Sequence, residues 1–86
     1  MNFGIKNYIP TASEQVTDDE HNFAKRVHCI RANARGRIYV RLRGDGASDW
    51  RALDVEAGEY VFGEIVAVRR GAVAAADLLG FVLPVE

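Results

Sequence analysis

Apolar and polar residues alternate most clearly over residues 37–43. Ile38, Val40 and Leu42 fall on one side of an extended chain, while three arginines, one tyrosine and no large aliphatic residue fall on the other. This period of two predicts a β-strand that places one face on a core and the other on water or a partner. It is the strongest single indication of secondary structure in the chain.

Other short stretches rich in β-forming residues are separated by residues that favour turns. The strands predicted in this way cover residues 27–30, 50–55 and 60–68, with turns at 33–36, 44–49 and 56–59. Residues 71–80 fit either a turn or a short helix, and a closing apolar strand follows over 78–83. Strands at a spacing of about ten residues predict an all-β fold, a small antiparallel β-sandwich or barrel.

The first 26 residues differ from the rest of the chain because most of residues 11–22 are polar. The spacing of Thr17 and Glu20 allows a capping box, and with it a short helix as far as Arg26, which would need packing to persist. We therefore expect an extended N-terminal arm or loop over residues 1–26 and a β-strand domain over residues 27–86.

Length and composition restrict the function more than they identify it. With 86 residues, 49% of them apolar and 27% charged, the chain suits one small soluble domain. It is too short for large catalytic scaffolds such as eight-stranded βα barrels. Cys29 is the only cysteine, and no stretch reaches membrane-spanning length, so we expect a protein made in a reducing cytoplasm without a membrane partner.

No group of residues has the spacing that catalysis or metal binding requires. His28 and Cys29 are neighbours on a predicted strand and therefore face opposite sides, so we expect Cys29 to be buried and inert. His21 follows an acidic run over 18–20 that lacks the ligand spacing of known metal sites. The glycines of 44–49 lack the third glycine of a dinucleotide fingerprint. We predict no enzyme activity, no catalytic residue, no metal and no cofactor.

Charge is distributed unevenly along the chain, although the net charge is −1. Residues 1–43 hold eight Lys/Arg against four Asp/Glu, a balance of +4, and residues 44–86 hold three against eight, a balance of −5. Opposed patches of this kind can meet between copies in a head-to-tail assembly. The residues that we predict at such an interface are Arg37, Tyr39, Arg41, Arg43, Trp50, Asp54, Glu56 and Glu59.

A second hypothesis assigns the arginine and tyrosine face to nucleic acid. Residues 35–42 match part of an RNA-recognition signature but lack its aromatic residues at Arg37 and Leu42. We therefore prefer a strand whose arginines form salt bridges, and we regard nucleic acid as the less favoured partner. The large aromatic side chains are expected to lie mostly in the core, with at least one available to anchor an interface; they are Tyr39, Trp50, Tyr60 and Phe62.

The order of elements from Ile9 to Val82 resembles the spike base (head-spike) or capsid decoration proteins of tailed phages and gene transfer agents. The resemblance covers about five-sixths of the chain. The segments that carry it are the polar stretch 11–19, the strand ending near Ile30, the Gly-turn strand 34–40, the Gly/Asp loop 44–46, the turn 55–60, the strand ending at 66–70 and the glycine-led closing segment 71–82.

This resemblance implies a virion structural protein without catalysis or cofactor. It implies a homo-oligomeric ring, trimer to hexamer, that binds the major capsid protein at a vertex and anchors a fibre or spike protein. The expected location is the capsid surface, after assembly in the bacterial cytoplasm. A tail or baseplate adaptor would share the fold and the absence of chemistry, and the nucleic-acid-binding β module remains the other alternative.

Overall fold

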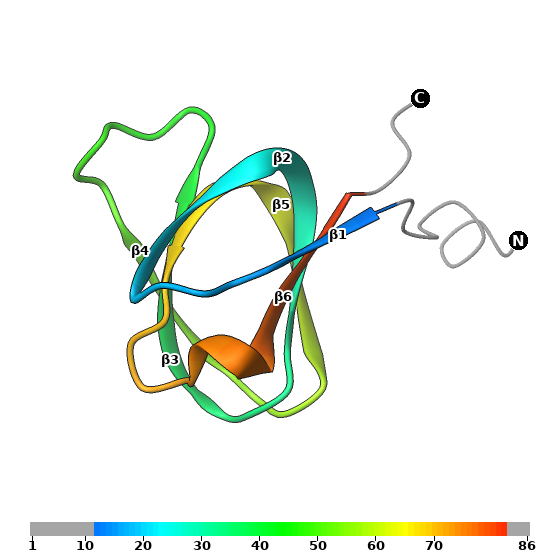
Figure 1. The fold of residues 1–86 in the computed structure, drawn as a ribbon. Helices are drawn as coiled ribbons and strands as arrows, with labels where there is room; N and C mark the ends of the chain where they lie inside the picture. Colours follow the sequence, from blue (N-terminus) through cyan, green and yellow to red (C-terminus); the bar gives the residue numbers. More distant parts are fainter. Residues whose placement is uncertain (1–11, 83–86) are drawn as a thin grey trace, which may run out of the picture.

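The described part of the chain folds into a single antiparallel sheet (Figure 1). The structure is a computed structural model that describes residues 12–82. Six strands lie in the order β1-β6-β2-β5-β3-β4, so that β1 and β4 form the two edges. The elements are β1 (Ala12–Gln15), β2 (Glu20–Ala32), β3 (Gly36–Leu42), β4 (Arg51–Val55), β5 (Glu59–Arg69), a short 3-10 turn (Ala75–Asp77) and β6 (Leu78–Val82). The predicted all-β fold is confirmed.

Two long strands, β2 and β5, bend the sheet over its own core. Their pairing shifts register twice, between Asn22 and Val27 and between Val27 and Cys29. Such irregularities bend a strand and increase its twist, and Figure 1 shows β2 arching over the molecule. The second half of β2 pairs with β6, whereas the second half of β5 pairs with β3. Because β1 and β4 do not pair, the arrangement is closer to a sandwich than to a closed barrel.

The core lies inside this bend, where alternate residues of the strands meet. On β3, Ile38 and Val40 are buried and Leu42 packs against the same cluster, while Arg37 and its neighbours on the other face point outward, as the alternation predicts. The buried cluster consists of Val16, Val27, Ile30, Ala32, Ile38, Val40, Val55, Ile65, Val68, Val73 and Leu78. Every one is aliphatic, so none of these side chains carries a polar group that needs a partner.

The expected arm or loop of residues 1–26 differs from the structure at residues 12–15 and 20–26, whereas residues 16–19 form a connecting loop. Residues 12–15 form β1 along β6, and β2 begins at Glu20 rather than near residue 27. Main-chain hydrogen bonds hold these polar residues in the sheet, and such bonds leave no pattern in the sequence. The possible helix before Arg26 is absent, because residues 18 and 19 form a bend and the chain then pairs with β5. Residues 1–11 of the expected arm lie outside the described residues.

The segment 71–80, for which the sequence allows a turn or a short helix, contains a turn followed by a single 3-10 turn. A turn at Gly71 leads into the three-residue 3-10 turn, and β6 follows at once from Leu78. Val73 lies in this connection and is almost fully buried, so the turn is anchored to the core by one side chain. Val73 and Leu78 are both fixed in the core, so only four residues lie between them. Four residues are too few for a stable α-helix.

Candidate interaction surface

The outer face of β3 is bound to the neighbouring strand by a salt bridge within the chain. Arg37 lies opposite Asp54 in the pairing of β3 with β4, and its Nε donates to Asp54 Oδ1 at 2.8 Å. Its Nη2 donates to the second carboxylate oxygen at 3.2 Å, so the contact is bidentate. The hydrogen bond and the charge of Arg37 hold the pKa of Asp54 below its ordinary value.

Other arginines around β3 also have acidic partners in the same chain. Arg43 and Arg26 both contact Glu64, each at 2.7 Å, and together they lower the pKa of that carboxyl. Arg51 binds Asp45 in the loop after β3 and, with the backbone N–H of Leu42, lowers the pKa of Asp45 to about 2. The positive charge that the sequence places on this face is therefore largely compensated within one chain.

Trp50, just before β4, contacts two arginines. The guanidinium carbons of Arg41 and Arg69 lie 4.9 Å and 4.7 Å from the centre of its ring. Arg41 donates to the carbonyl of Ala47 and to Asn22 Oδ1, and Arg69 donates to Glu20. Each cation–π contact contributes about 0.5–1 kcal/mol at such exposed sites, so the three side chains form one pre-ordered group.

The eight residues predicted at an interface do not all lie together. The structure brings Arg37, Tyr39, Arg41, Trp50 and Asp54 to the outer side of β3 and β4. Arg43 follows β3, Glu56 lies in the turn between β4 and β5, and Glu59 is the first residue of β5, where its side chain accepts the backbone N–H of Glu56 at 2.9 Å. Sequence reasoning did not place Arg69 in this group, because only the pairing of Tyr39 with Arg69 on β5 brings it there.

The expectation that most large aromatic side chains are core residues is wrong. Tyr39 and Trp50 are only partly buried, and Tyr60 and Phe62 are 46% and 59% exposed. Tyr60 and Phe62 stack on each other at 6.2 Å between ring centres, and Phe81 of β6 lies 6.3 Å from Tyr60. A second surface of interest therefore lies on the first half of β5.

This second surface, which we call the aromatic patch, spans three neighbouring strands. Strand pairing aligns its members in two rows across β6, β2 and β5: Leu79, Arg31 and Tyr60 in one, Phe81, Cys29 and Phe62 in the other. Cys29 is buried in the centre, as predicted, and burial raises the pKa of its thiol to about 11, so the thiol is protonated at neutral pH. The spacing of Tyr60 and Phe62 indicated that they share one face of a strand. It did not indicate whether that face is buried or exposed.

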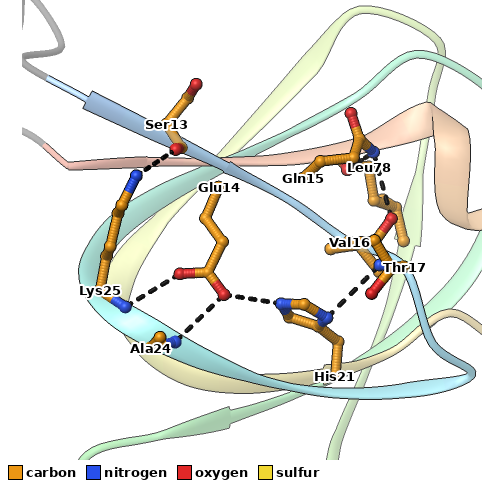
Figure 2. A network of polar contacts seen from close by, with 9 residues as sticks. All are labelled: Ser13, Glu14, Gln15, Val16, Thr17, His21, Ala24, Lys25 and Leu78. Carbon is orange, nitrogen blue, oxygen red and sulfur yellow. Dashed lines mark hydrogen bonds and ion pairs between the residues drawn. The ribbon is translucent and has the colours of Figure 1, made fainter.

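A network around Glu14 fastens the edge strand β1 to β2 (Figure 2). The Glu14 carboxylate accepts the backbone N–H groups of Ala24 and Lys25 at 3.1 Å and 2.9 Å, within the first register shift of β2. It also contacts His21 Nε2 at 2.8 Å, while His21 Nδ1 accepts the N–H of Thr17 at 3.4 Å. A neutral imidazole with its proton on Nε2 satisfies both contacts.

The environment of Glu14 favours its ionised form. Burial, the largest single effect, raises the pKa of the Glu14 carboxyl, but the hydrogen bonds from Ala24, His21 and Lys25 together outweigh it. The pKa therefore lies below its ordinary value, and the carboxylate substitutes for the backbone acceptor that the irregular pairing of β2 takes away. Its role is structural.

Two acidic residues of the run 18–20, and His21 after it, pair with partners within the chain. Asp19 pairs with Arg70, Glu20 with Arg69, and His21 with Glu14. Within residues 12–82, no three His, Cys, Asp or Glu side chains are grouped as a metal ion would require. A groove of about 330 Å³ beside Tyr39 is lined by Asp19, Glu20, Arg69 and Arg70, all already paired. In the same described part, no helix is both long and apolar enough to cross a membrane.

Comparison with known proteins found no matching family model, no matching curated protein and no matching solved structure. The resemblance to spike base proteins therefore rests on the sequence segments alone.

Proposed function

We propose that the protein is a virion structural protein, a capsid-vertex decoration or spike base that forms a homo-oligomeric ring and anchors a fibre or spike. Its partners would be further copies of itself, the major capsid protein and the fibre or spike protein. The site of action would be the capsid surface, after assembly in the bacterial cytoplasm. Catalysis and cofactors have no part in this proposal.

The observation that carries the assembly role is the contact of Trp50 with both Arg41 and Arg69 on the outer face. Trp, Tyr and Arg are the residue types that contribute most at protein interfaces, and side chains already held in place lose less conformational entropy on binding. Tyr39 and the Arg37–Asp54 pair extend the same surface. The assignment to a virion is supported by the sequence resemblance.

Replacing Arg41 with glutamate tests the assembly role of this face. The change removes one cation from the Trp50 ring and introduces a charge that repels acidic groups of a neighbouring copy, so we expect a shift from oligomer toward monomer. Light scattering on a sizing column measures the mass. Arg35→Glu makes the same charge change in the β2–β3 turn, where Arg35 only reaches Glu56 at 3.9 Å, and serves as the control. An Arg41→Glu protein that assembles like the wild type argues against this interface.

The alternative of a nucleic-acid-binding module has less support from the geometry. Arg37, Arg43 and Arg69 each contact a carboxylate of the same chain, which weakens the pull on a phosphate backbone. We therefore expect no binding of single-stranded DNA or RNA in the roughly micromolar range at physiological salt. Fluorescence anisotropy with labelled oligonucleotides measures this directly. Tight binding that weakens steeply with salt would favour the alternative over the virion proposal.

A further inference from the structure

A hollow opens between the two central strands, β2 and β5, at the first register shift of β2. Asn22 of β2 pairs with Ala67 of β5. The next aligned pair is Val27 with Ile65, so four residues of β2 lie opposite a single residue of β5. An ordinary bulge sets two residues against one. The extra chain is held by β1, since the Glu14 carboxylate accepts two of its backbone N–H groups.

Charged and apolar side chains line this hollow together. Its volume is about 190 Å³, and its lining includes Arg26, Arg43 and Glu64 beside the apolar Phe23 and Val66. Pockets for drug-sized molecules usually measure roughly 300–1,000 Å³. The hollow therefore suits a smaller group, of the size of a carboxylate or a phosphate on a short apolar stem.

Arg26 and Arg43 share one acidic partner, which leaves an excess of positive charge. The Nε atoms of both arginines contact the same oxygen, Glu64 Oε2, each at 2.7 Å. In the described part of the chain, neither arginine forms an ion pair with a second carboxylate. Both arginine side chains are 58% exposed, so the shared contact contributes little to stability. One of the two guanidiniums can therefore exchange this contact for another anion at little cost to the fold.

We propose that the hollow binds an oxyanion group, a carboxylate or a phosphate, that bridges Arg26 and Arg43. The planar guanidinium presents its N–H donors in a fork that matches the paired oxygens of both groups. The inference goes beyond the proposed assembly and does not depend on it, because Trp50 contacts Arg41 and Arg69, which do not line the hollow. One bridging anion needs a single pair of cations, whereas a nucleic acid strand needs a charged groove that follows its backbone.

Titration with sodium phosphate, followed by two-dimensional proton–nitrogen NMR, tests the site. With the ionic strength held constant by sodium chloride, we expect saturable shifts of the amide signals of residues 23–26 and 64–66. Arg26→Gln and Arg43→Gln should each weaken binding at least about ten-fold, the order of a hydrogen bond to a charged group. Arg35→Gln is the matched control, because it makes the same change at a mostly exposed arginine outside the hollow. Shifts that do not saturate, or that persist equally in both arginine variants, overturn the proposal.

Glu64→Gln distinguishes a ligand site from a salt bridge that serves only the fold. Removing the competing carboxylate leaves both guanidiniums to the ligand, so phosphate should bind several-fold more tightly than to the wild type. Binding that is unchanged or weaker in a folded Glu64→Gln protein contradicts the proposal. Sodium butyrate in place of phosphate identifies the source of the oxyanion. Tighter butyrate binding assigns a carboxylate on an apolar stem, tighter phosphate binding assigns a phosphate, and no binding of either excludes the site.

Discussion

Replacing Gly71 with alanine is expected to lower the free energy of unfolding by about 3 kcal/mol, because backbone strain and a steric clash coincide there. Gly71 has a φ of 55°, a conformation that an L-residue adopts only with strain. A Cβ at this position would lie 2.3 Å from the carbonyl oxygen of Arg37, which also accepts the N–H of Ala72. The turn would have to move away from β3 and give up that hydrogen bond.

Two other glycines separate the causes of this effect. Gly58 has a φ of 85° but open space around its Cβ position, so Gly58→Ala should cost only the strain, about 1–2 kcal/mol. Gly44 has open space and no positive φ, so Gly44→Ala should be close to neutral. Thermal unfolding followed by circular dichroism orders the three variants, and about 3 kcal/mol corresponds to roughly 12–24 °C in a domain of this size. If Gly71→Ala and Gly58→Ala lower the free energy of unfolding equally, the clash with the Arg37 carbonyl does not destabilise the protein.

Replacing Glu14 with glutamine is expected to destabilise the protein by about 2 kcal/mol at neutral pH, the order of a charge-assisted hydrogen bond in a sheltered position. The Glu14 side chain is 16% exposed and serves two backbone N–H groups and His21. A glutamine keeps one acceptor oxygen but turns an NH₂ group toward donors. Urea unfolding at pH 7 measures the loss, and Glu56→Gln, 70% exposed, should leave the midpoint unchanged.

The lowered pKa of Glu14 also predicts how this loss depends on pH. Because the folded pKa lies below the ordinary value of 4.5, the stabilisation is fully present above that pH and is lost as the pH falls toward the folded pKa. The difference in unfolding free energy between the wild type and Glu14→Gln should therefore narrow below about pH 4.5. A difference that stays constant down to pH 3 would mean that the carboxylate charge contributes nothing to the network in Figure 2.

The outer face of β3, with Arg37, Tyr39 and Arg41, shows which contacts an alternating pattern can predict and which it cannot. The pattern of residues 37–43 was enough to place Ile38 in the core and Arg37 and Arg41 outside. It could not identify Arg69 as the second cation on Trp50, because that contact depends on the pairing of Tyr39 on β3 with Arg69 at the far end of β5. It also could not show that Asp54, expected to meet a neighbouring copy, pairs with Arg37 in its own chain.

The aromatic patch was missed for a different physical reason. On β5 both faces are apolar: Val61 packs toward the core, and Tyr60 and Phe62 lie on the opposite side. Alternation says only that Tyr60 and Phe62 share a face. Which face points inward is decided by the pairing with β2 and β6 and by the bend that the register shifts introduce.

The sequence by itself determined that the chain is all-β, where the strand with one polar face lies, and which loops separate the strands from residue 27 onward. These properties depend on local alternation and on turn-forming residues, which act over a few positions. Only the tertiary structure decided that residues 12–15 and 20–26 belong to the sheet, that Glu14 supports the irregular part of β2, and that Tyr60 and Phe62 face outward. Each of these depends on hydrogen bonds or packing between segments distant in the chain, and the residue types at either end do not specify such contacts.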